Sequence, residues 1–158
     1  MISINHQLLD ALSSEARKSM RKRKNYNFHK EPEARIQRML NSMEPGTYVR
    51  PHKHENPDKL EVFFCLRGKI AIIEWTEMGE VHQVEILDPL KGNFGVEVPP
   101  RTWHSLISLE SGSVAWEVKD GPYDPIDDKY FAEWAPSEGD SNAEAWLNDL
   151  VIRLGLGI

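Results

Sequence analysis

The pattern of apolar and polar residues changes near residue 35 of the chain. Before that point, from residue 5 to about 19, Leu8, Leu9, Leu12 and Ala16 recur at helical spacing with no Gly or Pro between them. After it, short apolar or alternating runs follow one another. They cover residues 36–41, 47–53, 60–67, 69–76, 80–87, 94–98, 103–109 and 113–119. The pattern predicts an N-terminal helix packed outside a sheet of many short strands.

Turn residues separate most of these runs, for example Pro45 with Gly46 and Arg67 with Gly68. Many short strands at near-regular spacing favour an all-β sandwich or barrel. Residues 119–125 contain two prolines and cannot continue a central strand, because proline has no N–H to donate to the ladder. We expect this segment to form an arm across the barrel.

A second helix is predicted near the C-terminus. Ser141 and Glu144 have the spacing of a capping box. An apolar stripe follows them, made of Trp146, Leu147, Leu150, Val151 and Leu154. We therefore expect one structural domain in three parts: a helix and extended arm (1–35), a barrel (36–125), and a C-terminal arm and helix (126–158).

Composition narrows the class of protein. The chain has 158 residues, a net charge of −6 and a single cysteine, Cys65. One cysteine excludes an internal disulfide, and the acidic charge gives no reason to expect a nucleic-acid partner. A basic cluster between positions 17 and 24 could meet an anionic ligand, but composition favours the alternative of a solvated face. No apolar run is long enough for a membrane span or a secretory signal, so we expect a cytoplasmic protein with no membrane insertion.

Two histidines, His52 and His54, carry the strongest chemical signal. On an extended strand, residues i and i+2 point to the same face about 6.5 Å apart, so both imidazoles can reach one metal ion. Tyr48 and Arg50 share their parity and would face the interior with them. A buried arginine is costly unless it is paired with an anion, so Arg50 is a candidate contact for a substrate phosphate or carboxylate, the alternative being a salt bridge at the rim.

The stretch from Gly46 to Gly68 resembles the first conserved motif of the cupin superfamily, which has a glycine, two histidines one residue apart, a glutamate and a closing glycine. It departs from the commonest form because six residues, rather than three or four, separate His54 from Glu61. The turn formers between them predict an enlarged hairpin loop that leaves the strand register intact. Glu55 and Asp58 remain rival carboxylates on that loop.

The segment from Pro99 to His104 resembles the second cupin motif, with Arg101 in place of its glycine and Ser108 where an asparagine often follows. The resemblance implies a double-stranded β-helix, or jelly-roll barrel, with short terminal helices in this chain. It also implies a metal site of His52, His54, Glu61 and His104. Nitrogen and oxygen ligands suit one divalent transition metal ion, and Zn, Fe, Mn, Ni and Co all stay open.

Nearly the whole chain is similar to the WbuC family of cupin-fold metalloproteins. The similarity is carried by Arg21–His29, Pro51–His54, Trp103–His104, Glu117–Pro125 and Trp134–Asp140. Members of that family are found with genes for bacterial O-antigen and lipopolysaccharide biosynthesis. The resemblance therefore implies a fold, a metal site and a carbohydrate context, but no particular substrate.

Several further residues are candidates for substrate binding. Arg21, Arg23, Asn25, Asn27 and His29 alternate, which suggests an extended strand whose polar face meets the ligand, the alternative being a solvated connector. Trp103 and Trp116 could stack on a sugar ring, although a role in the aromatic core is the commoner one. The predicted substrate contacts are Arg23, Asn25, Asn27, His29, Tyr48, Arg50 and Trp103.

Three functions are compatible with these features. The leading hypothesis is a metal-binding cupin that acts on or recognises a carbohydrate precursor, such as a sugar or nucleotide sugar, with isomerase-like or epimerase-like chemistry. The second is a noncatalytic sugar or small-anion binding module with a structural metal. The third is an iron-dependent dioxygenase. A homodimer is compatible with all three.

Overall fold

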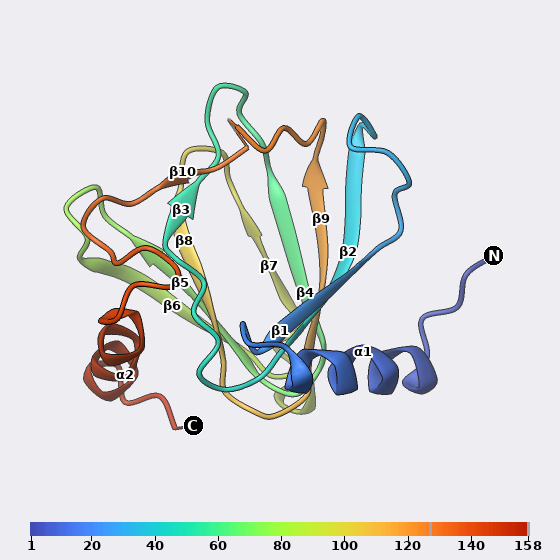
Figure 1. Ribbon diagram of the computed structural model, residues 1–158, viewed down its shortest axis with the longest axis horizontal. Coiled ribbons are helices and arrows are strands. Elements are labelled where there is room, and N and C mark those ends of the chain that lie inside the picture. Colours follow the sequence, from blue (N-terminus) through green and yellow to red (C-terminus); the bar gives the residue numbers. More distant parts are fainter. Residues whose placement is uncertain (127, 158) are drawn as a thin grey trace.

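The strands and helices come from a computed structural model that describes residues 1–126 and 128–157. The strands are β1 (Arg23–Asn27), β2 (Ile36–Met43), β3 (His52–Lys53), β4 (Glu61–Arg67), β5 (Ile70–Trp75), β6 (Val81–Leu87), β7 (Gly95–Val98), β8 (Trp103–Ser108), β9 (Ser113–Asp120) and β10 (Tyr130–Phe131). They form two antiparallel sheets, ordered β1-β2-β9-β4-β7 and β10-β3-β8-β5-β6, that face each other (Figure 1). The predicted all-β jelly-roll barrel with two short helices is confirmed.

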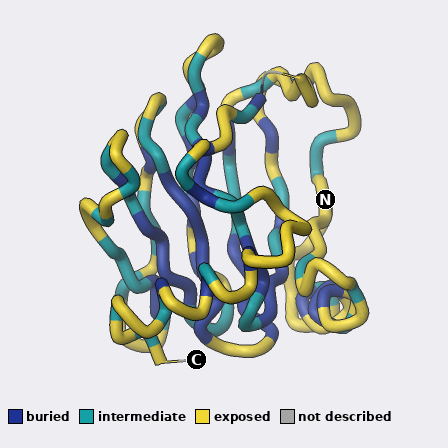
Figure 2. Tube along the Cα trace, turned by 60° about the vertical axis from the view of Figure 1, so that its left-hand side comes forward, coloured by how far each residue is buried: buried dark blue, intermediate teal, exposed yellow. Residues whose placement is uncertain are grey.

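The interior of the barrel is polar at one end and apolar at the other. Along β4, Glu61, Phe63 and Cys65 face inward, as their alternation predicts. Phe63 and Cys65 pack with residues of the opposite sheet such as Ile72 and Leu106. Buried positions run along the strands, and exposed positions gather at the turns and on the outer side of the N-terminal helix (Figure 2). This apolar packing closes the end of the barrel that is lower in Figure 1. Glu61, at the start of β4, lies near the opposite, open end.

The two helices cover the outer faces of the sheets. Helix α1 (His6–Lys18) is capped by Asn5, which accepts a hydrogen bond from Leu8 N, and it packs on Leu40 and Val114. Helix α2 (Ala143–Arg153) packs on the other sheet through the predicted apolar stripe. The predicted capping box is wrong, because Asn142 occupies the N-cap position and makes no side-chain cap hydrogen bond. A short 3-10 helix, η1 (Pro89–Lys91), lies between β6 and β7.

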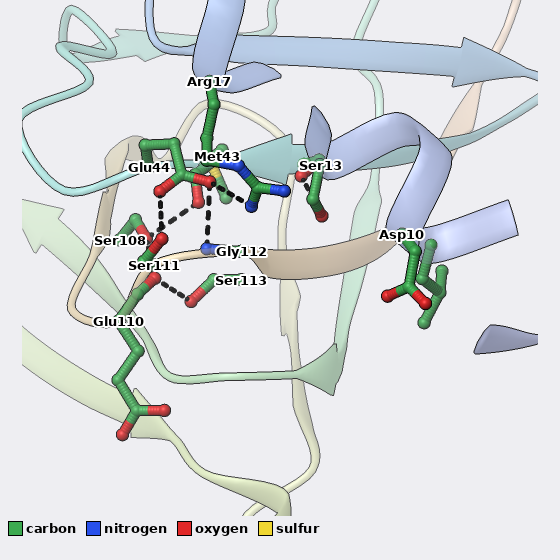
Figure 3. A network of polar contacts seen from close by, with 12 residues as sticks. Asp10, Ser13, Arg17, Met43, Glu44, Ser108, Glu110, Ser111, Gly112 and Ser113 are labelled. Atoms are coloured by element: carbon green, nitrogen blue, oxygen red, sulfur yellow. Dashed lines mark hydrogen bonds and ion pairs between the residues drawn. The ribbon is translucent and has the colours of Figure 1, made fainter. Parts of the chain in front are cut away.

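A buried carboxylate fastens α1 to the closed end of the barrel (Figure 3). Glu44 follows β2 and accepts hydrogen bonds from Ser111 Oγ and from Gly112 N at 3.0 Å. Arg17 of α1 approaches the same carboxylate at 3.5 Å. Since every partner is a donor, the buried charge is compensated and the turn before β9 is held against the helix.

Two expectations about the segment around the histidine pair are wrong. The predicted strand over residues 47–53 is reduced to His52–Lys53, because Gly46 turns the chain at a φ of +79° and Pro51 has no N–H for a ladder. The expected hairpin loop after His54 is instead a connection between sheets, since β3 and β4 belong to different ones. The register of Glu61 is nevertheless the predicted one.

Candidate metal centre

Four side chains from both sheets converge near the open end of the barrel. His52, His54, Glu61 and His104 each offer one ligand atom, and these atoms all lie within 4.8 Å of one another. His52 on β3 stands directly opposite His104 on β8, while Glu61 opens β4 in the facing sheet. All four side chains are buried, with exposed fractions of 1–2%.

Backbone carbonyls select the same tautomer for all three histidines. His52 Nδ1 lies 2.9 Å from Arg50 O, His104 Nδ1 lies 2.9 Å from Thr102 O, and His54 Nδ1 contacts Asp128 O. A carbonyl oxygen only accepts, so each Nδ1 carries the proton and donates it. Each Nε2 therefore holds a free lone pair, which is the form of histidine that binds metal.

The inward-facing atoms lack the partners that buried polar groups require. His54 Nε2 lies 3.2 Å from Glu61 Oε1, and His104 Nε2 lies 2.7 Å from Glu61 Oε2. In the selected tautomer both Nε2 atoms and both Glu61 oxygens are hydrogen-bond acceptors, so none can donate to another. Among the described residues, His54 Nε2, His104 Nε2 and Glu61 Oε2 have no hydrogen-bond partner. A cation among them would satisfy all three, so the residues present fit a divalent metal ion.

The electrostatics of the cluster favour the metal-binding protonation states. Burial, together with the charges of Lys129 and His104, holds the pKa of His52 well below its ordinary value. Burial raises the pKa of Glu61, but the charge and hydrogen bonds that His104 and His54 provide when protonated outweigh it, and the pKa lies well below its ordinary value. At neutral pH the His52 imidazole is therefore neutral and the Glu61 carboxylate is ionised, as metal ligation requires.

Asp128 connects the four-residue cluster to two buried lysines. Its carboxylate accepts hydrogen bonds from Lys59 Nζ at 2.6 Å and Lys119 Nζ at 2.7 Å, and its backbone carbonyl contacts His54. All three charged side chains are buried. No motif in the sequence indicated this network, although Lys119 has the same inward parity as Ala115 on β9, and a lysine at an inward position is a signal of a buried ion pair.

Arg101 replaces the glycine of the second cupin motif and adopts a backbone conformation typical of glycine. It adopts a φ of +66°, the left-handed conformation that glycine adopts freely, and its N–H donates to His54 O at 2.9 Å. Its side chain pairs with Asp58 at 2.8 Å. Of the two rival carboxylates, Asp58 is thus held by Arg101 and Glu55 pairs with Lys53 at 3.3 Å. Neither belongs to the four-residue cluster.

A cavity of about 750 Å³ lies between the sheets, and His52 and Glu61 form part of its wall. Four of the predicted substrate contacts line it from the N-terminal segment: Arg23, Asn25, Asn27 and His29. Their contact with a ligand stays a prediction. Residues that the sequence analysis did not select also line the cavity, namely Glu117 and Lys119 of β9 and Tyr123 and Lys129 of the following arm.

The other three predicted contacts do not line this cavity. The Tyr48 hydroxyl donates to Pro136 O at 2.8 Å, and its ring packs on α2. Arg50 donates to Ala132 O and Ser137 Oγ. Trp103 Nε1 donates to Glu77 at 2.7 Å. Tyr48 and Arg50 do not have the predicted inward parity, because residues 47–51 are not a regular strand. Trp103 precedes the inward-facing His104 and points the opposite way.

Glu117 is another carboxylate in the cavity wall. It accepts a hydrogen bond from Asn41 Nδ2, and it stands opposite Phe63 on β4. Burial and the nearby charge of Glu61 raise the pKa of Glu117 to about 7. It can therefore exchange a proton near neutral pH.

The fold is the jelly-roll barrel of cupins, and three histidines and a glutamate converge between its sheets. The fold is similar to that of a cupin 2 domain-containing protein from Halorhodospira halophila, with 17% identity, a TM-score of 0.51, and 83% of this chain and 81% of that chain covered. By its sequence, the chain belongs to the family described as Domain of unknown function (DUF6016), whose model matches residues 4–96.

Two further structures share the fold. KdgF from Halomonas sp. has 15% identity and a TM-score of 0.51, with 66% of this chain and 82% of that chain covered. CapF from Staphylococcus aureus, described as a capsular polysaccharide assembling protein, has 24% identity and a TM-score of 0.56. The match covers 69% of this chain but only 29% of CapF. No curated protein matches the chain. Within the described residues, neither helix is both long and apolar enough to cross a bilayer.

Proposed function

We propose that the protein is a metal-dependent cupin that binds and chemically modifies a carbohydrate precursor of a bacterial surface polysaccharide, in the cytoplasm. The observation that carries this proposal is the convergence of four side chains that can ligate a metal, two of which, His52 and Glu61, line a large cavity. Resemblance to the WbuC family, with its O-antigen and lipopolysaccharide context, supports the carbohydrate assignment. The fold shared with CapF, which assembles capsular polysaccharide, points the same way.

His52, His54, Glu61 and His104 would hold the ion. A divalent metal bound there would polarise a carbonyl or hydroxyl oxygen of the ligand. The amides of Asn25 and Asn27 face the same cavity and would hydrogen-bond sugar hydroxyls.

Glu117, with a pKa near 7, would take up or release a proton at the sugar carbon or hydroxyl. Proton exchange beside a polarised oxygen is the chemistry of an isomerase or epimerase, and this is the reaction type proposed. Replacing Glu117 by Gln should abolish turnover while leaving metal content and ligand binding in place.

Metal content tests the ligand set. Protein purified without added metal should contain about one ion per chain, and His52→Ala or His104→Ala should release it. His82→Ala is the matched control, because His82 is an exposed histidine on β6, outside the cluster. Unchanged metal content in both cluster variants would overturn the proposed site.

Turnover separates the proposed enzyme from its alternatives. The metal-loaded protein would be incubated with a panel of sugars and nucleotide sugars, and products followed by NMR. Isomerised or epimerised sugar supports the proposal. Binding without any product would instead assign a noncatalytic module. Oxygen consumption that requires iron and a substrate would assign a dioxygenase.

A further inference from the structure

The wall of the cavity has the opposite charge to the protein as a whole. The chain carries a net charge of −6. In the cavity wall, however, cationic side chains outnumber carboxylates by six to three. The cationic residues are Arg21, Arg23, Lys24, Lys30, Lys119 and Lys129. A positively charged wall concentrates anions within a protein that otherwise repels them.

Most of these cations are already paired within the protein. Arg21 and Arg23 share the carboxylate of Glu138, at 2.5 and 2.7 Å. Lys119 is paired with Asp128, and Lys24 approaches Glu15 at 3.5 Å. Their charges hold the segments around the cavity together, so these side chains are not the first candidates for gripping a ligand.

Lys30 and Lys129 make no hydrogen bond or ion pair with any residue that the structure describes, but Lys30 is exposed whereas Lys129 is partly buried. Lys129 lies on the arm after β9, between Asp128 and strand β10, and its side chain lines the cavity. It is close enough to lower the pKa of His52 by its charge. Burial lowers the pKa of Lys129 itself, against the opposing effect of Glu61. A partly desolvated ammonium group without an ion pair is unfavourable until an anion reaches it.

The backbone around Lys129 is anchored on both sides. Asp128 is fixed by two buried lysines, and Ala132 N donates to Pro51 O just beyond β10. Strand β10 also pairs with β3, which carries His52. An ammonium group on an anchored segment can bind a ligand with little loss of conformational entropy.

We propose that the cavity selects an anionic carbohydrate, whose carboxylate or phosphate oxygens are bound by the ammonium group of Lys129. This inference rests on the proposed function and names the class of sugar that it takes. The neutral part of the sugar would lie toward Asn25 and Asn27, which form the uncharged part of the wall on β1. Sugar acids and sugar phosphates share the required anionic oxygens, and binding measurements distinguish them.

Isothermal titration calorimetry of the purified full-length protein would compare glucose, glucuronate and glucose 1-phosphate. We expect at least one anionic sugar to bind about tenfold or more tightly than glucose, as expected for one charge-assisted contact. Tighter binding of glucuronate would indicate a carboxylate ligand, and tighter binding of glucose 1-phosphate a phosphate ligand. Lys129→Met should remove this preference, and Lys129→Arg should keep most of it.

Lys91→Met is the matched control, because it removes the same charge from an exposed lysine outside the cavity. Asn27→Asp provides a second route that leaves the arm untouched, since a new negative charge in the wall should also weaken the anionic sugars selectively. Equal affinities for all three sugars, or the same preference in the Lys129→Met and Lys91→Met variants, would overturn the inference. With glucose still bound and metal still present, that result would leave the proposed function standing. Absence of binding of all three sugars would count against both.

Discussion

Replacing Asp128 by Asn would leave two buried lysines facing a neutral amide. In the native protein the three side chains are 2–4% exposed, and both ammonium groups lie within 2.7 Å of the carboxylate. Breaking a buried ion pair costs about 3–5 kcal/mol. For a domain of this size each 1 kcal/mol lowers the melting temperature by roughly 2–4 °C, so we expect a decrease of roughly 6–20 °C.

Thermal unfolding followed by circular dichroism measures this decrease. Asp149→Asn is the matched control, since Asp149 pairs with Arg153 on the exposed side of α2 and its side chain is 67% exposed. We expect the control to change stability by no more than about 0.5 kcal/mol. If the melting temperature of Asp128→Asn lay within roughly 2 °C of that control, the buried network would have no stabilising role.

The stability difference between wild type and Asp128→Asn should depend on pH. Burial raises the pKa of Asp128, but Lys119 and Lys59 outweigh it, and the pKa lies below its ordinary value. A depressed pKa in the folded state gives a stabilisation that is complete above the unfolded pKa of about 3.9 and is lost as the pH falls through the folded pKa. The stability difference between wild type and Asp128→Asn should therefore shrink below about pH 4. A difference that grew on acidification would contradict this assignment.

Cys65 and Arg101 provide two further predictions. Burial raises the pKa of the Cys65 thiol to about 11. At pH 8 an alkylating reagent should therefore label the native protein far more slowly than the urea-unfolded protein, and equal rates would contradict the burial of Cys65. Arg101→Gly should keep the metal content and change stability by no more than about 1 kcal/mol, because glycine adopts the same φ freely. Arg101→Val should lower stability by about 1–3 kcal/mol in chemical denaturation, and an equal effect of both substitutions would refute the role of the left-handed conformation.

The parts of the fold that could be predicted are those with a local signal. Helix α1 has helical periodicity, and β4 is a short apolar run bounded by turn residues, so both could be predicted from the sequence. The four convergent side chains followed from strand parity at His52 and His54 and from the resemblance to cupin motifs at Glu61 and His104.

The parts that could not be predicted depend on contacts between distant segments. The two-residue strand β10 has too few residues to show a period, and it exists because it pairs with β3. Asp128 and Lys129 reach the site from an arm whose path is set by Lys59 and Lys119. The failure at Tyr48 has a local cause, since a parity argument requires a regular strand and Pro51 interrupts the ladder.

The connection between β3 and β4 crosses from one sheet to the other, and this bears on how relatives of the protein are recognised. A tight hairpin would tie the spacing of its flanking residues to a turn type. A crossing between two facing sheets is different, because the position of Glu61 is set by its ladder with β7 and β9. The number of residues between His54 and Glu61 can then vary without moving either side chain. A search pattern that requires three or four residues there would pass over chains with the same four converging side chains.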